Sequence, residues 1–189
     1  MTGVEWVDAE TMAGDPDGVE RLWTPHRMAY VRNASERPRI EDTRECPLCK
    51  TEQDDDRAHL IVHRGTHCYV VLNLYPYNPG HLMICPVRHI GWYTETSDAE
   101  RDEMAALTQD AMRVLQAVTG TQGFNIGMNQ GVTGGAGISE HLHQHVVPRW
   151  VGDANFLPIV GKTKAVPELL DDTWERLSTA WSLHVKGDA

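Results

Sequence analysis

The sequence predicts an α+β fold, in which an antiparallel sheet carries one central helix and a further helix lies near the C-terminus. Three observations lead to this fold class. Short apolar runs are separated by tight turns, as in antiparallel sheets. One long stretch in the middle of the chain has apolar residues at helical spacing. A second helical stretch follows a proline close to the end of the chain. Strands joined by tight turns around a helix are typical of the α+β class.

Short apolar segments predict the strands of the sheet. A turn at Arg64-Gly65 separates the first two segments, Pro86 stops the third, and Pro148 closes the last. The predicted strands are 60–62, 68–72, 81–85, 124–128 and 141–147.

Helix signals bound two further segments. Ser97 or Asp98 is a suitable N-cap for a helix that Gly120 ends. Its predicted core face holds Met104, Leu107, Ala111, Val114, Leu115 and Val118. A second helix is predicted over 167–183, with Pro167 near its first turn.

The bulk composition limits the function classes. The chain has 189 residues, 41% of them apolar, and a net charge of -10. A net-acidic chain is a poor candidate for coating nucleic acid, whose binding depends on a basic surface. No apolar run is long enough to span a membrane, and the acidic N-terminus is unlike a secretory signal, so we expect a cytoplasmic protein. We divide it into an N-terminal arm and connector (1–45), a compact domain (46–160) and a C-terminal helical segment (161–189).

Three alternating histidines are the most informative feature of the chain. His141, His143 and His145 share one face if the segment EHLHQHVVPRW is a strand, because side chains alternate between the faces of a strand. Such a row could bind a metal ion, carry out nucleophilic or acid–base chemistry on a phosphate, or simply be packed or exposed. The pattern alone leaves these alternatives open.

A glycine-rich loop, GVTGGAG at 131–137, directly precedes this segment. Glycines let backbone N–H groups approach an anion, although they are equally typical of a flexible loop. A glycine loop leading into a histidine face favours phosphate chemistry, because it brings phosphate donors beside a nucleophile.

The run HLHQHVV (141–147) resembles the signature of the histidine triad family, His-φ-His-φ-His-φ-φ with φ apolar. Gln144 departs from the signature at one φ position, on the side away from the imidazoles. The segments NLYPYNPGHLMICP (73–86) and FNIGMNQG (124–131) resemble two further family markers. The segments LWTPHRMAYV (22–31) and RWVGDANFLPIV (149–160) are similar to one bacterial branch, the diadenosine tetraphosphate phosphorylases or hydrolases.

The resemblance implies roles for individual residues. The middle histidine of the family attacks the α-phosphorus, which gives His143 the role of nucleophile, with His141 and His145 as its catalytic neighbours. Phosphate or ribose contacts fall on Asn73, His81, Asn129 and the loop residues Gly137 and Ser139. Gly137 stands where related enzymes often carry Gln. On sequence alone, His81 could simply begin a strand, and a turn residue that bonds its own backbone is the favoured role for Asn73.

A pair of cysteines predicts a metal site. Cys46-Pro-Leu-Cys49 has the spacing of a zinc knuckle, although it could also be a reduced pair without metal. Some histidine triad proteins complete such a pair with two histidines, which here are His89 and His141. A zinc ion with four protein ligands would be structural. Cys68 and Cys85 are expected to be ordinary core cysteines.

The resemblance implies an enzyme that splits dinucleoside polyphosphates through a covalent nucleotidyl-histidine, with inorganic phosphate or water as the second acceptor. An adenosine phosphoramidase and a nucleotide-binding regulator are the alternatives. No organic cofactor is expected. The family also implies a homodimer with a joined sheet, to which an unpaired strand edge is suited.

Overall fold

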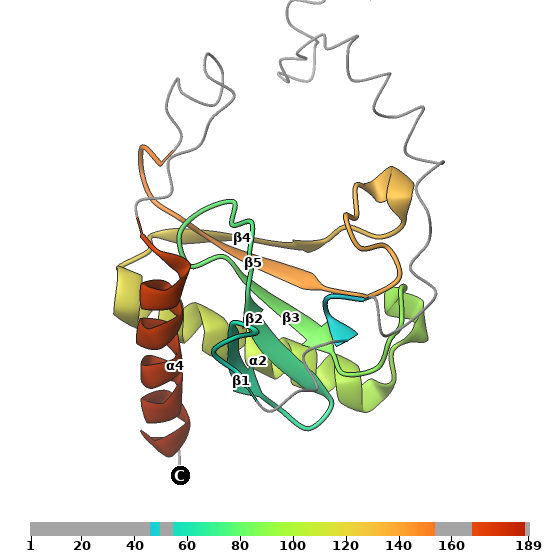
Figure 1. Ribbon diagram of the computed structural model, residues 1–189, viewed down its shortest axis with the longest axis horizontal. Helices are drawn as coiled ribbons and strands as arrows, with labels where there is room; N and C mark the ends of the chain where they lie inside the picture. The colour runs from blue at the N-terminus through green and yellow to red at the C-terminus, as the bar shows by residue number, and fades with distance from the viewer. Residues whose placement is uncertain (1–45, 50–54, 154–167, 188–189) are drawn as a thin grey trace, which may run out of the picture. The chain divides into compact units, whose positions relative to one another are not determined.

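The computed structural model describes residues 46–49, 55–153 and 168–187 (Figure 1). The N-terminal segment 1–45, including 22–31, and the segment 154–167, including Pro167, lie outside the described residues. The elements in chain order are β1 (Ile61–Arg64), β2 (Cys68–Leu72), β3 (Leu82–Pro86), the short 3-10 helix η3 (Tyr93–Glu95), α2 (Asp98–Thr119), β4 (Gly123–Met128), the 3-10 helix η4 (Val132–Gly134), β5 (Gln144–Arg149) and α4 (Leu170–Gly187).

The strands form one five-stranded antiparallel sheet in the order β1-β2-β3-β5-β4. With the two helices, this confirms the predicted α+β class. The last histidine of the triad lies inside the sheet, because His145 is paired with Met83 of β3 on one side and with Gly127 of β4 on the other.

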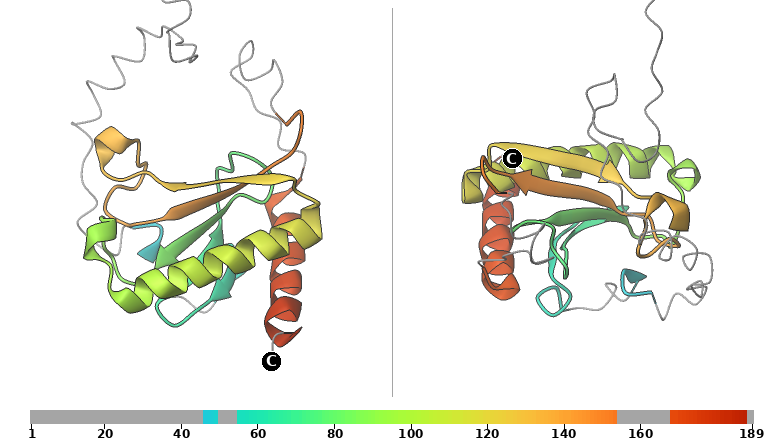
Figure 2. Two further views of the ribbon diagram at one scale, coloured as in Figure 1. Left: turned by 180° about the vertical axis from the view of Figure 1, so that it is seen from behind. Right: turned by 90° about the horizontal axis from the view of Figure 1, so that it is seen from above.

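Two apolar clusters cover the two faces of the sheet. On one face, α2 packs along the strands (Figure 2), and the alternate β2 residues Cys68, Val70 and Leu72 join its core. On the other face, Tyr69 and Val71 pack with Cys46 and its neighbours. Both faces are therefore covered at the centre of the sheet, which explains why β2 and β3 are buried at every position.

The ends of α2 follow the predicted signals. Ser97 caps the first turn by accepting a hydrogen bond from the Glu100 N–H, and the Glu100 side chain bonds back to the Ser97 N–H. This reciprocal pair is a capping box. Gly120 ends the helix in the left-handed conformation, with φ 62°, which glycine adopts without steric cost.

The C-terminal helix is confirmed, with bounds that differ from the prediction. Leu177 and Trp181 of α4 are fully buried in the same core as α2. The Trp174 indole N–H donates to the Ile61 carbonyl at 2.7 Å, which ties α4 to the outer strand β1. Neither α2 nor α4, nor any other helix within the described part of the chain, has the length and apolar character that crossing a membrane requires.

The histidine strand begins later than predicted. The ladder of β5 starts at Gln144, because the preceding Leu142 N–H donates to the Ile90 carbonyl at 2.6 Å instead of to a neighbouring strand. The predicted stop at Pro148 is also wrong. The pairing with β3 ends at Val146, so Pro148 pairs with β4 alone, and its carbonyl accepts from the Asn78 side chain.

Candidate functional site

The middle histidine of the triad is held in one tautomer by the main chain. The Nδ1 of His143 lies 2.8 Å from the carbonyl oxygen of His141, and a carbonyl can only accept. His143 therefore donates from Nδ1 and keeps a lone pair on Nε2. Its side chain is buried, and this burial lowers the pKa of the imidazole, which favours the neutral form. A neutral imidazole with a free ring nitrogen is a competent nucleophile.

A chain of hydrogen bonds also fixes the next histidine. The Tyr77 N–H donates to Nδ1 of His81 at 3.0 Å, so the neutral His81 ring carries its proton on Nε2. That Nε2 lies 2.9 Å from Nδ1 of His145, which must then accept. The neutral His145 ring consequently carries its own proton on Nε2.

The N–H of His145 is a buried donor beside the candidate nucleophile. Among the described residues, its Nε2 has no hydrogen-bond partner. The rings of His143 and His145 meet edge to face, with centroids 5.0 Å apart. Burial, followed by the proximity of His143, lowers the pKa of His145 to about 4. A buried N–H without an acceptor is costly, so its presence here points to an anionic ligand.

Asn73 is a turn residue whose side chain also contacts His81. Its Oδ1 accepts from the Tyr75 N–H at 2.9 Å, as a turn residue would. This bond orients the amide, and Nδ2 lies 3.2 Å from Nδ1 of His81. Asn73 thus joins the site through His81, which is itself fully buried.

The glycine loop before β5 contains two glycines with positive φ and exposes part of its backbone. Gly131 and Gly135 have φ of 68° and 87°, in the region that glycine adopts readily. A Cβ at Gly134, Gly135 or Gly137 would meet no atom within 4 Å, so the loop presents bare backbone. No hydrogen bond within the described part of the chain uses the amides of residues 137 to 139.

Two further residues that were predicted to contact phosphate flank the histidine strand, one in the loop before it and one just after the end of the neighbouring strand β4. The Ser139 hydroxyl donates to its neighbour Glu140 at 2.6 Å. Asn129 follows directly after Met128, which is paired with Gln144, so it is adjacent to the site along β4.

Gln144, the residue that departs from the family signature, points to the helix side of the sheet, where its amide donates to the Thr108 hydroxyl at 2.7 Å. Its departure from the signature therefore affects packing.

The four predicted metal ligands meet in one place. Each of the residues Cys46, Cys49, His89 and His141 offers a ligand atom, and these atoms all lie within 4.8 Å of one another. The Sγ of Cys49 is 3.0 Å from Nδ1 of His89 and 3.3 Å from Nδ1 of His141. In a tetrahedral zinc site the ligand atoms are roughly 3.3–3.8 Å apart, given bonds of about 2.0–2.3 Å. The donor set and its spacing fit a zinc ion.

The orientation of His141 suits a metal ligand. Its Nε2–H donates to the Pro86 carbonyl at 2.9 Å, which leaves Nδ1 with its lone pair towards the cysteines. Burial lowers the pKa of His141 to about 4 and so keeps the ring neutral. A second ring nitrogen bonded to a backbone carbonyl is the usual support of a metal-binding histidine.

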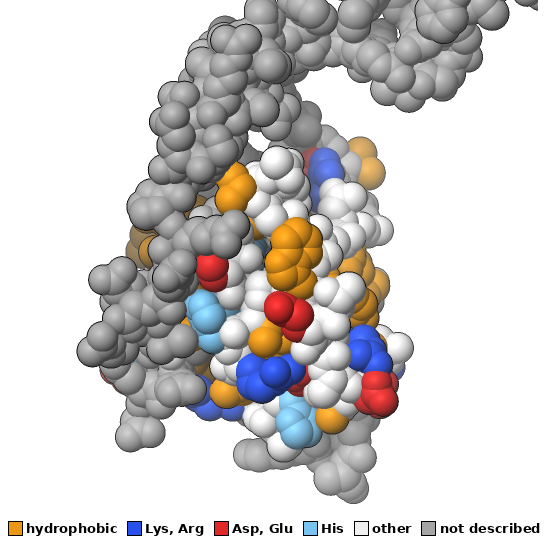
Figure 3. Space-filling view, turned by 90° about the vertical axis from the view of Figure 1, so that its right-hand side faces the viewer, with side chains coloured by type: hydrophobic (Ala, Val, Ile, Leu, Met, Phe, Trp, Pro, Cys, Tyr) orange, Lys and Arg blue, Asp and Glu red, His pale blue; other side chains and the backbone are white. Residues whose placement is uncertain are grey.

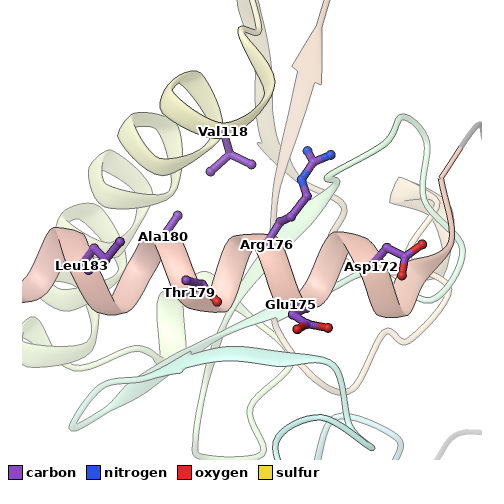
Figure 4. Close-up of a pocket in the computed structure, with 7 residues that line it drawn as sticks. All are labelled: Val118, Asp172, Glu175, Arg176, Thr179, Ala180 and Leu183. Atoms are coloured by element: carbon purple, nitrogen blue, oxygen red, sulfur yellow. The ribbon is translucent and has the colours of Figure 1, made fainter.

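Neither the face in Figure 3 nor the pocket in Figure 4 points to a different site. On the face that Figure 3 shows, the basic side chains of the described residues are scattered among acidic and neutral ones and form no continuous patch. A pocket where α4 faces α2 is lined by Val118, Asp172, Glu175, Arg176, Thr179, Ala180 and Leu183 (Figure 4). It contains none of the predicted site residues.

Sequence reasoning missed three residues that support the histidines. Tyr77 contributes both its N–H to His81 and its ring, whose centroid is 4.7 Å from that of His81. Asn78 donates to the Pro148 carbonyl and to Asp153, and so anchors the segment that precedes His81. The motif YPYNPG contained the first two as turn residues, but nothing in the sequence connects Asp153 with them.

Comparison with known proteins agrees with this geometry. Residues 55–151 match the family model of the HIT domain. The chain is 46% identical over 171 residues to a protein of Mycobacterium tuberculosis (strain CDC 1551 / Oshkosh) named AP-4-A phosphorylase. The matched region covers 89% of this chain and 88% of the relative. An uncharacterized HIT-like protein of Methanocaldococcus jannaschii is 29% identical over 121 residues, covering 64% of this chain and 91% of the relative.

Solved structures share the fold. A zinc-bound histidine triad family protein from Mycobacterium smegmatis has a TM-score of 0.61 at 22% identity, covering 77% of this chain and 99% of that one. A uridylyltransferase mutant has a TM-score of 0.63 at 17% identity, covering 86% of this chain and 55% of that one. With the triad, the buried histidine relay and the extended identity taken together, the chain belongs to the histidine triad (HIT domain) family, in the branch represented by the mycobacterial AP-4-A phosphorylase.

Proposed function

We propose that this protein is an enzyme that cleaves dinucleoside polyphosphates of the diadenosine tetraphosphate type through a covalent nucleotidyl-histidine on His143. The observation that carries the proposal is the pair of fixed tautomers: a lone pair on Nε2 of His143 beside an N–H on His145 that has no partner among the described residues. The identity to a named AP-4-A phosphorylase supports the substrate class.

In the first step, Nε2 of His143 attacks the α-phosphorus. An N–P bond forms, and the bond between that phosphorus and the bridging oxygen breaks, so ATP departs with the electron pair. The N–H of His145 hydrogen-bonds the oxygen on which charge develops. This oxygen becomes part of a terminal phosphate whose pKa is about 6, so no proton has to be transferred at neutral pH.

In the second step, inorganic phosphate attacks the adenylyl phosphorus. An oxygen of the phosphate forms the new P–O bond, the N–P bond breaks, and His143 regains its lone pair as ADP leaves. Water in place of phosphate would give AMP. The bare amides of 137–139 would hold the non-bridging oxygens in both steps, as backbone nests do for phosphates.

Product analysis tests the proposal. The purified protein is incubated with diadenosine tetraphosphate, with and without inorganic phosphate, and nucleotides are separated by chromatography. We expect ADP and ATP only when phosphate is present. AMP and ATP without phosphate would show a hydrolase that uses the same covalent step. No cleavage under either condition would contradict the proposed substrate, and adenosine phosphoramidates would then be tested.

We also propose that Cys46, Cys49, His89 and His141 hold a structural zinc. The ligand spacing supports this, and four protein ligands would leave no open position for a substrate or water. Bound zinc would stabilise the approach to β5, because it would tie the turn at 46–49 to the residues just before the strand.

A homodimer is the assembly that we propose. The edge strand β4 leaves Asn125, Ile126 and Gly127 exposed, whereas β1 at the other edge packs against α4. An uncovered edge is a ready surface for pairing with a second copy of the same strand, which would join the two sheets.

A further inference from the structure

The segment between β2 and His81 is anchored by one buried side-chain amide, that of Asn78. The Asn78 side chain is 3% exposed, and its Nδ2 donates to the Pro148 carbonyl at 2.8 Å and to Oδ2 of Asp153 at 2.7 Å. These bonds attach a segment without regular structure, 73–81, to the end of β5 and to the turn after it.

Asp153 is itself held rigidly. Arg149 donates to both carboxylate oxygens of Asp153, with Nε at 2.6 Å from Oδ2 and Nη2 at 2.9 Å from Oδ1. The remaining guanidinium nitrogen of Arg149 donates to Oδ1 of Asn125 on β4 at 2.6 Å. Arg149 also lowers the pKa of Asp153 well below its usual range, so the carboxylate stays charged. Bidentate pairs of this kind fix orientation as well as distance.

Asn78 directly follows Tyr77, whose N–H determines which nitrogen of His81 carries the proton. The main-chain carbonyl of Asn78 accepts from the His81 N–H at 3.1 Å, and the preceding residue, Tyr77, supplies the N–H that bonds Nδ1 of His81. If this segment moved and displaced both donors to Nδ1, the Tyr77 N–H and the Asn73 side-chain amide, His81 could place its proton on Nδ1. His145 would then donate from its own Nδ1 to His81 and present a lone pair, which repels phosphate oxygens, where it now presents an N–H.

We propose that Asn78 and Asp153 are positioning residues, which fix the tautomers of His81 and His145 and thereby aim the His145 N–H at the phosphate chain. The kinetic consequence rests on the proposed function, whereas the tautomers do not.

Two variants and one matched control test this inference. Asn78→Ala removes the anchor, and Asp153→Asn weakens it while it keeps the shape of the side chain. Asp171→Asn is the control, because Arg57 bonds Asp171 in the same bidentate way, at 2.8 and 2.6 Å, on α4. The readouts are the ring ¹⁵N shifts of His81 and His145 by long-range NMR, kcat and KM for diadenosine tetraphosphate, and the melting temperature.

For Asn78→Ala we expect a mixture of His81 and His145 tautomers and a fall in kcat of about 10- to 100-fold, with KM changed less than about 3-fold. Asp153→Asn should change both readouts in the same direction by less, and it decides the question if Asn78→Ala does not fold. Asp171→Asn should leave tautomers and kcat unchanged.

Wild-type tautomers in both anchor variants would overturn the inference, even if kcat fell. Unchanged kcat with altered tautomers would overturn the role in catalysis. A wild-type protein that does not cleave the dinucleotide would contradict the proposed function alone, because the ¹⁵N comparison needs no substrate.

Discussion

The Nδ1 of His143 lies 2.8 Å from the carbonyl oxygen of His141, whose own ring belongs to the Cys/His cluster. His141 thus connects the Cys/His cluster with the candidate nucleophile, although the sequence shows only a single row of histidines. The ring of His141 turns to the cysteines, while its carbonyl fixes the tautomer of the candidate nucleophile. The third histidine, His145, is oriented independently, through His81.

His143→Ala should abolish turnover. Without the imidazole no covalent intermediate forms, and loss of a nucleophile costs about 10⁴- to 10⁶-fold in kcat. Nucleotide release is followed by chromatography, and the adenylylated wild-type protein is sought by mass spectrometry after an alkaline quench, because the N–P bond is labile in acid. His184→Ala is the control, since that ring lies on α4 and bonds Asp110 of α2. A His143→Ala variant with near wild-type turnover would exclude the covalent mechanism.

His145→Ala should slow cleavage without preventing formation of the intermediate. Removing one preorganised donor to a developing charge costs about 10²- to 10³-fold. The loss should be smaller for an adenylyl ester of a good leaving group, such as nitrophenol, which needs less stabilisation of its departing oxygen. Comparing kcat for the two substrates measures this difference. An equal loss for both would argue against contact between His145 and the leaving group.

Replacing the cysteine pair should remove the metal and destabilise the fold. The purified protein is expected to contain about one zinc per chain, and Cys46→Ser/Cys49→Ser to contain essentially none, with a lower melting temperature. Elemental analysis and thermal unfolding measure both. Cys68→Ala is the control, because that thiol lies in the core, where burial raises its pKa to about 12 and makes it a poor ligand. Wild-type protein that is free of zinc and indifferent to chelators would contradict the proposed site.

Local signals in the sequence predict much of this fold and single out the central histidines as a candidate site. Ser97 and Gly120 bound α2 because capping depends on the residue at the cap itself. The triad and the cysteine pair carry their chemistry in their side chains, so their residue types and spacing already point to His143 and to Cys46 and Cys49.

The remaining parts depend on contacts that leave no local pattern. Tyr77 acts on His81 through its main-chain N–H, which every residue except proline possesses. Asn78 and Asp153 are 75 positions apart, and only the fold brings them together. The start of β5 was misplaced for the same reason, since the bond from Leu142 to Ile90 is invisible in the histidine pattern.

The exposed edge of β4 predicts the effect of an added charge on assembly. Ile126 is 46% exposed, and a two-fold pairing of β4 would bring its copies close together. Ile126→Lys should therefore weaken the dimer, because like charges would face each other across the new ladder. Light scattering after size exclusion measures the molar mass, with Leu183→Lys on α4 as the control. Wild-type protein that stays monomeric at micromolar concentration would contradict the proposed dimer.

The ion pair between Arg88 and Glu100 predicts a pH-dependent contribution to stability. The Glu100 side chain is 3% exposed, and Arg88 bonds its two oxygens at 2.8 and 2.7 Å. Arg88 is the largest cause that lowers the pKa of Glu100, to about 2 from an ordinary value of 4.5. A carboxyl with a depressed pKa stabilises the folded state above pH 4.5, and this contribution is lost as the pH falls from there towards 2.

Glu100→Gln should therefore unfold more easily than the wild type at pH 7, because it loses the ion pair with Arg88. We expect a loss of about 1–3 kcal/mol in the free energy of unfolding, and no more, because Arg88 is half exposed and solvent screens the pair. Urea unfolding at several pH values should show this difference shrinking between pH 4.5 and pH 3. Asp98→Asn is the matched control, since Asp98 pairs with Arg101 on the same helix but is 90% exposed. A Glu100→Gln deficit that stayed constant down to pH 3 would mean that packing around the side chain, and not its charge, stabilises this end of α2.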